Sequence, residues 1–374
     1  MASAPASAAR DLPAAPDPER RILALDGIRA LAIGVVVLFH YTVRWAAPFD
    51  PADHLPQGAW FAGVPLLHYG WMGVELFFVV SGFVIAMSLE RSRGIGDFAL
   101  RRFARLWPPL LVAALITMVV VDSVGPHDWR AGPGDLLASL AFIDPSLYGD
   151  HHWVDGAYWS LFVEVKFYVL AALLHRMAGT GFVHAWLVLL ATTSLLAVYA
   201  PAWAVPLLEL LFAPYMAYFV LGICCHELFR SGQDEALARL GFVFAALLIL
   251  MASWLGTGIF AGHAPLWTTS INLAIVCLFA LFALGSDLLR FLAAPPLVGL
   301  GRISYSLYLV HQFAGVTMLR CLVATGLPYL FALPTVILAM VGAASILYRA
   351  VEVPGKDLIL HGFCPRARPA RAPA

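Results

Sequence analysis

The sequence predicts an all-α protein, a polytopic transmembrane helical bundle of about ten spans with both termini in the cytoplasm. Of the 374 residues, 61% are hydrophobic and 12% are charged, whereas a soluble domain carries roughly 45–50% apolar and about 25% charged residues. The apolar residues fall in runs long enough to cross a bilayer, which takes about 20 residues of helix. The cationic residues gather in alternate connections between those runs, which is typical of one cytoplasmic face.

Each expected span is a helix, because a chain in lipid must satisfy its backbone polar groups internally. The spans lie near residues 22–44, 70–90, 107–124, 157–178, 182–200, 207–228, 240–260, 268–288, 303–325 and 331–352. If residue 1 is cytoplasmic, the 23 Lys and Arg residues fall on the inward side, with the exceptions of Arg44, Arg130, Lys166 and Arg320. This asymmetry predicts that both termini lie inside and that the number of spans is even.

The chain divides into three expected segments. Residues 1–20 are rich in Ala, Pro and Ser and are predicted to be a disordered cytoplasmic tail. Residues 21–356 form the predicted membrane domain, and residues 357–374 a basic cytoplasmic tail. No short apolar segment with a cleavage site precedes the first span, so we expect no cleaved signal peptide.

Composition also disfavours several classes of function. The net charge is zero at pH 7, so nucleic acid is not an expected partner. The five cysteines form no CxxC pair and are interpreted as small apolar fillers, so no metal site is expected. The sequence gives no indication of oligomeric state.

Titratable side chains inside predicted spans are costly in lipid and usually mark function. The residues of this kind are His40, Glu75, Glu164, Lys166, Glu209 and His311. In the first span, Arg29 and His40 are eleven residues apart. About three helical turns therefore separate them on one face, roughly 16 Å along the axis. This spacing suits a phosphate at Arg29 and a thioester at His40, although a snorkelling arginine and a packing histidine would give the same pattern.

The fourth predicted span carries Ser160, Glu164 and Tyr168 at steps of four, so they share a face. Glu164 reaches about the depth of His40 from the opposite direction. A carboxylate there could orient the imidazole and stabilise its protonated form. The alternative is that Glu164 pairs with Lys166 or Arg320.

Four further segments carry interpretable patterns. Gly70, Gly73 and the Ser81–Gly82 pair of the second span predict close helix packing. The following inward loop holds Arg101, Arg102 and Arg105, whose guanidinium groups suit phosphate binding, although the positive-inside rule alone also places arginines there.

The ninth span presents Ser304, Tyr308 and His311 at i, i+4 and i+7, which predicts a polar stripe on a cavity or a helix partner. The long outward segment 125–156 is interpreted either as a loop with interfacial aromatic residues or as a lid over a polar acceptor. His151 and His152 in it are adjacent and are not expected to bind a metal.

Five of these segments, in order, resemble the motifs of the acyltransferase-3 family of integral membrane O-acyltransferases. They are LDGIRALAIGVVVLFH at 25–40, GWMGVELFFVVSGFVI at 70–85, RRFARLWPP at 101–109, WSLFVEVKFY at 159–168 and GRISYSLYLVH at 301–311. Glu352–Val353–Pro354 is similar to the family's closing element, and Ala30 stands where glycine is common. The resemblance covers about residues 22–356.

The resemblance implies transfer of an acetyl or other short acyl group from cytoplasmic acyl-CoA to a hydroxyl of an extracytoplasmic or lipid-linked saccharide. It also implies location in the bacterial cytoplasmic (inner) membrane, with membrane lipids as partners and no permanently bound cofactor. His40 is the implied base and Glu164 its partner. The implied donor contacts are Arg29, Arg102, Arg105 and Ser81, and the implied substrate contacts are Tyr168, Trp159, Ser304, Tyr305, His311 and Glu75.

Several alternatives stay open at the level of sequence. Buried His, Glu and Lys residues also build proton relays, so a proton-coupled transporter of a small polar solute is the main rival. The absence of an evident inverted repeat weighs against it. Within the enzyme hypothesis, the acceptor could be a macrolide or a periplasmic glucan, with succinyl as the acyl group. Direct transfer and a covalent acyl-histidine intermediate are equally compatible with the residues.

Overall fold

The computed structural model describes residues 18–145, 151–199, 201–231 and 236–363, and every regular element in these ranges is helical. The longer helices are α1 (Pro18–Thr42), α3 (Gly73–Glu90), α4 (Ile95–Val124), α6 (Trp159–Ala178), α7 (Phe182–Tyr199), α9 (Ala213–Ser231), α10 (Ala236–Leu255), α11 (Pro265–Ala283), α14 (Phe313–Ala324), α15 (Tyr329–Leu347) and α16 (Val353–Phe363). The shorter ones are α2 (Pro65–His68), α5 (Pro133–Leu140), α8 (Val205–Leu210), α12 (Pro295–Arg302), α13 (Ser304–Val310) and the π-helical turn Tyr348–Glu352. Most of the two predicted tails lies outside the described residues.

The described residues contain eight segments long and apolar enough to span a membrane, and a ninth if the bent pair α13 and α14 forms one span. One of the eight, Gly156–Tyr199, consists of two helices, α6 and α7. The rings of Phe167 and Trp186 lie 5.5 Å apart, so the chain folds back at Gly179, where φ is +52°. With α6 and α7 taken separately, the polytopic helical bundle predicted from the sequence is confirmed.

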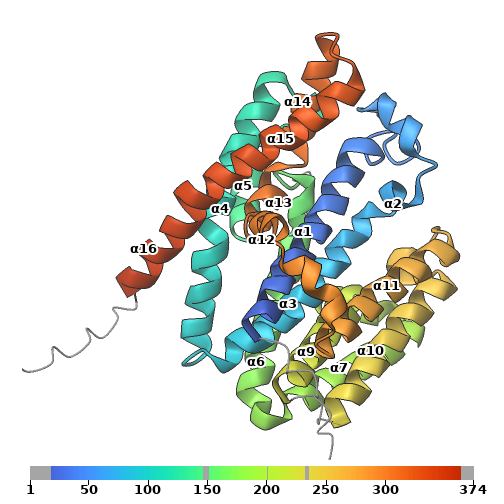
Figure 1. Ribbon diagram of the computed structural model, residues 1–374, viewed down its shortest axis with the longest axis vertical. Helices are drawn as coiled ribbons and strands as arrows, with labels where there is room; N and C mark the ends of the chain where they lie inside the picture. The colour runs from blue at the N-terminus through green and yellow to red at the C-terminus, as the bar shows by residue number, and fades with distance from the viewer. Residues whose placement is uncertain (1–17, 146–150, 200, 232–235, 364–374) are drawn as a thin grey trace, which may run out of the picture.

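Glycines bring the central helices together, as the small-residue pattern predicts. Helices α1 and α3 cross near the middle of the bundle, and α3 packs along α9 (Figure 1). A Cβ on Gly82 of α3 would collide with the carbonyl of Phe219, and one on Gly222 of α9 with the carbonyl of Val79. At Gly73 the same position meets the backbone of α1 at Ala32, 2.7 Å away. These contacts fix α3 between α1 and α9.

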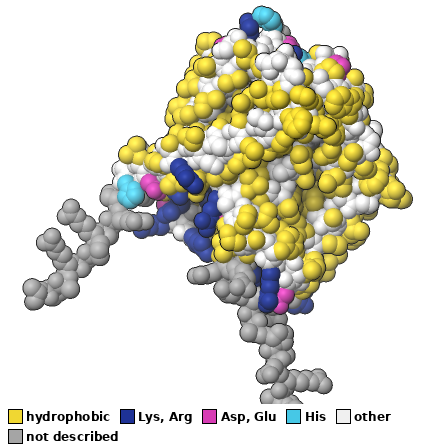
Figure 2. Space-filling model, turned by 45° about the horizontal axis from the view of Figure 1, so that its top comes forward, with side chains coloured by type: hydrophobic (Ala, Val, Ile, Leu, Met, Phe, Trp, Pro, Cys, Tyr) yellow, Lys and Arg dark blue, Asp and Glu magenta, His cyan; other side chains and the backbone are white. Residues whose placement is uncertain are grey.

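Charge divides the molecule into two ends. The start of α1 and the end of α16 lie toward the same end, which is the lower one in Figure 1. Most of the Lys and Arg side chains visible in Figure 2 gather there, whereas the flanks of the bundle are mainly hydrophobic. We call this the arginine end and the opposite one the loop end.

Two elements differ from the sequence prediction. Helix α4 begins at Ile95 rather than near 107, so Arg101, Arg102 and Arg105 lie on a helix and not in a loop. The predicted span 303–325 is not continuous, because α13 and α14 meet at an angle of 61° after His311. The break turns the histidine and its backbone away from a straight helical path.

Candidate active site

Three cavities follow one another from the arginine end toward the loop end. The arginine cavity, of about 270 Å³, is lined by Ser88, Arg91, Arg101, Arg102, Arg105 and Lys356, among others. The central cavity, of about 80 Å³, shares Val84, Arg102 and Arg105 with it. The histidine cavity, of about 600 Å³, is lined by His40 and shares Val74 and Tyr308 with the central cavity. The cavities therefore form a series through the bundle, with Tyr308 between the second and third.

The central cavity brings together arginines from two helices. Arg29 of α1 enters it and pairs with Asp26 at 3.0 Å, and Arg102 and Arg105 enter from α4. Arg102 donates to the Ser88 hydroxyl at 2.9 Å. Its buried Nε has no hydrogen-bond partner among the described residues. The convergence of these three arginines leaves guanidinium groups available for an anionic ligand.

Glu164 lies in this arginine-lined cavity and not beside His40. Its Oε1 accepts hydrogen bonds from Ser81 at 2.7 Å and from Tyr168 at 2.5 Å. The shared face of Ser160, Glu164 and Tyr168 is confirmed, since all three line the central cavity. The expected contact with His40, however, is not made among the described residues. The similar depth of Glu164 and His40 in their spans does not determine the direction in which each side chain points.

His40 is paired instead with a second histidine. Its Nδ1 lies 2.9 Å from the carbonyl of Val36 and 3.2 Å from Nε2 of His311. His311 Nδ1 lies 2.8 Å from the carbonyl of Tyr308. A carbonyl only accepts, so the network assigns the proton of each neutral ring to Nδ1. His311 Nε2 then accepts from His40, and His40 Nε2 keeps a free lone pair.

The backbone around His311 is held from two sides. Tyr41 donates to the His311 carbonyl at 2.7 Å. Asp155, fully buried, accepts from the amide of Phe313 at 2.8 Å and from that of Ala157 at 2.9 Å. One carboxylate thus caps both the start of α14 and the turn that precedes α6. Asp155 precedes a predicted span, and an Asp in that place is a common N-cap, which is the signal in the sequence that marks it.

The remaining predicted site residues divide between the cavities. Ser304 and Tyr305 line the central cavity, and Tyr305 donates to the carbonyl of Leu106 at 2.9 Å. Trp159 and Glu75 line the histidine cavity. His311 is not among the lining side chains of the three cavities and lies behind His40.

The two other intramembrane charges, Lys166 and Glu209, lie outside this series of cavities. Lys166 Nζ donates to the backbone carbonyl of Glu209 at 2.7 Å and lies over the ring of Phe162. The alternative pairing of Glu164 with Lys166 is therefore not found among the described residues. Glu352, in the closing element, accepts from Ser306 at 2.6 Å and ties α13 to the π-helical turn that follows α15.

Part of the long outward segment borders the histidine cavity. Trp129 stacks on Phe313 at 4.5 Å with an angle of 10° between the rings, and also contacts Trp45. Asp135 lies nearby in the chain: burial alone would raise its pKa, but donors from Gly132, His152 and His151 outweigh this and lower its pKa. Residues 146–150 are outside the described chain, and the lid interpretation stays a prediction.

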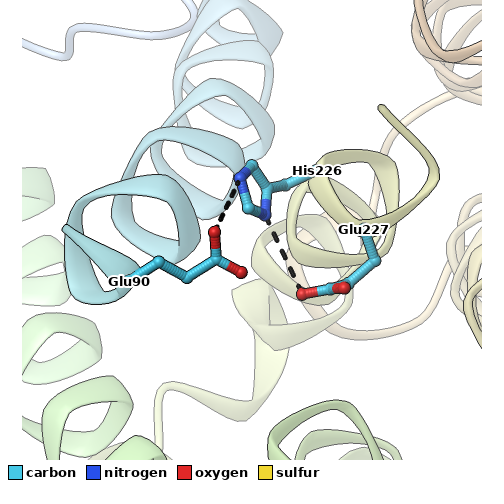
Figure 3. Close-up of side chains that lie close together, drawn as sticks. All are labelled: Glu90, His226 and Glu227. Carbon is cyan, nitrogen blue, oxygen red and sulfur yellow. Dashed lines mark ion pairs between the residues drawn. The ribbon is translucent and has the colours of Figure 1, made fainter. Parts of the chain in front are cut away.

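A separate cluster of Glu90, His226 and Glu227 joins α3 to α9 at the arginine end (Figure 3). The imidazole lies between the carboxylates, with Nε2 3.8 Å from Glu90 and Nδ1 3.9 Å from Glu227. Arg230 pairs with both carboxylates, at 3.4 and 2.7 Å. Because each ring nitrogen faces a different carboxylate and a guanidinium balances both, this geometry suits a structural ion-pair network better than a metal ion.

The fold and these residues define a class of protein: a multi-pass membrane protein with a half-buried histidine on the wall of an internal cavity. The chain belongs to the acyltransferase-3 family, because the family model described as "Acyltransferase domain" matches residues 22–349. It is therefore an acyltransferase that transfers groups other than amino-acyl groups. The resemblance proposed from the motifs is confirmed.

Curated relatives carry matching names. The chain is 30% identical to "Acyltransferase MdmB" of Streptomyces mycarofaciens, over 72% of this chain and 76% of that protein. It is 28% identical to "Putative membrane-bound transacylase BcsY" of Komagataeibacter xylinus, over 79% and 73%. It is 23% identical to "O-acetyltransferase OatA" of Staphylococcus aureus, over 90% of this chain but 57% of that protein. No solved structure matches the chain.

Proposed function

We propose that this enzyme moves an acetyl or other short acyl group from acyl-CoA, bound from the cytoplasm, to a hydroxyl of an extracytoplasmic or lipid-linked saccharide. The proposed location is the bacterial cytoplasmic (inner) membrane, with the arginine end inward. The observation that carries the proposal is the series of cavities leading from the arginines to His40. Support for a saccharide acceptor comes from the relatives, since one match is named "Peptidoglycan O-acetyltransferase OatA", from Listeria monocytogenes, with 29% identity over 39% of this chain.

The donor is proposed to occupy the first two cavities. Arg91, Arg101 and Lys356 at the mouth, with Arg102 and Arg105 deeper, suit the phosphates of CoA. The narrow central cavity, with Arg29 and Ser81 on its wall, suits the slender pantetheine arm. The thioester would then reach Tyr308, which borders both the central and the histidine cavity.

His40 is the proposed base. Its Nε2 accepts the proton of the acceptor hydroxyl while the hydroxyl oxygen attacks the thioester carbonyl carbon. The carbon–sulfur bond breaks, and the imidazolium returns the proton to the departing thiolate, so that CoA leaves with a neutral thiol group. The His311 lone pair accepts from Nδ1–H of His40 throughout, which stabilises the positive charge on the ring. In this proposal His311, and not Glu164, is the group that orients the imidazole of His40 and stabilises its protonated form.

A two-step route through acyl-His40 uses the same Nε2 lone pair, as nucleophile instead of base. The two routes make different intermediates. Incubation of the purified enzyme with acyl-CoA and no acceptor should leave the protein mass unchanged if transfer is direct. A gain of one acyl group that is absent from His40→Ala would establish the covalent route.

The test of the proposal uses membranes that contain the full-length enzyme, supplied with labelled acetyl-CoA or succinyl-CoA. We expect acyl transfer to membrane or surface glycan together with release of CoA. His40→Ala should reduce transfer by at least 100-fold, because general-base catalysis contributes roughly 10²–10⁴-fold. The matched control is His184→Ala, at an exposed position on α7. Solute flux without CoA release, or normal transfer by His40→Ala, would refute the proposal.

A further inference from the structure

The break after His311 separates backbone groups that a straight helix would join. In an unbroken helix each amide bonds to the carbonyl four residues earlier, so Phe313 would bond to Leu309, and Gln312 to Tyr308. Neither bond is found among the described residues, and α13 and α14 meet here at 61°. Buried backbone groups in proteins nearly always have a partner, so the freed groups should be bound elsewhere.

One turn of the chain supplies partners for both halves of the first lost bond. Asp155 accepts from the amide of Phe313 at 2.8 Å, and Tyr158 donates to the carbonyl of Leu309 at 3.2 Å. Asp155 and Tyr158 both belong to the turn that leads into α6. This turn therefore binds, on either side of the break, the amide and the carbonyl that would otherwise pair with each other.

The second lost bond frees the carbonyl that orients His311. In a straight helix the Tyr308 carbonyl would accept from the amide of Gln312. Here it lies 2.8 Å from Nδ1 of His311. The Nε2 of the same ring faces Nδ1 of His40 at 3.2 Å. The open break and the contact between the two imidazoles thus occur in the same few residues.

Asp155 is the costly group in this arrangement. It is fully buried, and in the described ranges its carboxylate bonds to the amides of Ala157 and Phe313 without a paired cation. A buried carboxylate of this kind is expensive, whereas an uncharged Ser, Thr or Asn would cap Ala157 as well. The carboxylate differs from them in offering one oxygen to each of two amides that are distant in the sequence.

We propose that Asp155 is a positioning residue for the base. It holds the break open, so that the Tyr308 carbonyl orients the ring of His311 and His311 accepts from His40. The catalytic meaning of this inference rests on the proposed function. No contact of the Asp155 carboxylate with either imidazole is found in the described part of the chain, so it acts through the backbone at Phe313. The end of the outward segment 125–156 thereby helps to set the geometry of the base.

The experiment observes the two rings directly. Purified full-length protein with ¹⁵N-labelled histidine, in nanodiscs without donor or acceptor, is studied by NMR, and His40→Ala assigns the signals. We expect a coupling across the hydrogen bond between the rings, and its loss in Asp155→Ser. Serine can still cap Ala157 but does not offer an oxygen to each amide. Ser286→Ala is the matched control, because it removes a similar cap, on the amide of Leu288, and should leave the coupling unchanged.

Kinetics of the same variants connect the contact to the reaction. For acyl transfer from labelled acetyl-CoA, Asp155→Ser should lower kcat roughly 10- to 100-fold, because a small misplacement of a catalytic group has effects of this size. KM for acetyl-CoA should stay the same, since the cavities proposed for the donor are not altered. Ser286→Ala should change neither value. A merely structural role would lower the melting midpoint without removing the coupling.

The outcomes separate the two proposals. Loss of the coupling in Asp155→Ser supports the positioning role even if the native protein consumes no acetyl-CoA, a result that would count against the proposed function alone. Absence of the coupling in the native protein, an unchanged coupling in Asp155→Ser, or an unchanged kcat in an enzyme that consumes acetyl-CoA would overturn it. If Asp155→Ser does not fold, Asp155→Asn, which keeps one carbonyl oxygen for the two amides, replaces it, and an unchanged coupling there overturns the proposal.

Discussion

At the scale of single residues, a backbone carbonyl decides the chemistry of His40. Because Val36 and Tyr308 each offer an acceptor to an Nδ1, both rings carry their proton there. The imidazole of His40 is thereby left with its basic nitrogen free and with a neutral hydrogen-bond acceptor behind it. Because His311 is neutral, no second charge is buried beside the positive charge that forms on His40 in the proposed reaction.

Replacement of His311 should affect the rate and not the binding of the donor. His311→Phe removes the acceptor behind His40, so we expect kcat to fall roughly 10²-fold or more with little change in KM for acyl-CoA. His311→Asn, whose amide oxygen can still accept, should lose less. Steady-state kinetics of both variants provide the measurement. A rise in KM with unchanged kcat would show that His311 does not position the base.

Replacement of the arginines should affect the binding of the donor and not the rate. Arg105→Gln should raise KM for acyl-CoA roughly 10- to 100-fold, because a bond between charged groups is lost, and should change kcat little. The dependence of KM on salt should become weaker at the same time. Arg290→Gln is the matched control, since Arg290 is exposed and pairs with its neighbour in the chain, Asp287, at 2.7 Å. Equal KM values for the two variants would exclude Arg105 from the donor site.

The residues of the candidate site are predictable from the sequence, but their partners are less so. Arg29, Arg102 and Arg105 were expected to act together and do converge, and Tyr168 does contact Glu164. The prediction that Glu164 contacts His40 is wrong. Helical periodicity gives the depth and relative angle of residues within one helix, but not the rotation of one helix against another. The helix also breaks directly after His311, and no proline marks that break.

At the scale of elements, most spans were predictable because hydropathy sets their length. The start of α4 was not predictable from hydropathy. Residues 95–106 are too polar for a membrane segment, but they continue the same helix outside the apolar span. Pro108 and Pro109 lie inside this helix, although prolines usually mark a helix start. The bend at His311 was missed for a similar reason: it is held by Asp155 and Tyr41, which are distant in the sequence.

The contact of α3 with α9 should be intolerant of a single methyl group. In Gly82→Ala the new Cβ would meet the carbonyl of Phe219, so the helices must separate, and overpacking of this kind costs about 1–3 kcal/mol. We expect a lower midpoint of thermal unfolding in detergent. Gly342→Ala is the control, because nothing lies within 4 Å of that Cβ. Equal melting of both variants would show that close packing at Gly82 is not needed.

At the scale of the whole molecule, the separation of charge suggests why the site crosses the bilayer. Arginines line one end of the cavity series, and an aromatic cavity lies at the other. For the proposed reaction, such an arrangement would keep the highly charged acyl-CoA on one side and the acceptor on the other, so that only the acyl group would have to pass Tyr308. Hydropathy and arginine placement predict this polarity, but the order of the three cavities depends on side-chain packing and required the structure.

The sidedness of the reaction tests this picture in full. CoA is polyanionic and does not cross lipid, so acyl-CoA reaches the arginine cavity only from the face on which that cavity opens. With the arginine end cytoplasmic, sealed inside-out vesicles should release CoA from added acetyl-CoA, and sealed right-side-out vesicles should do so only after permeabilisation. The permeabilised right-side-out sample controls for enzyme content. Release by intact right-side-out vesicles alone would place the arginine end outside, which the excess of Lys and Arg at that end argues against.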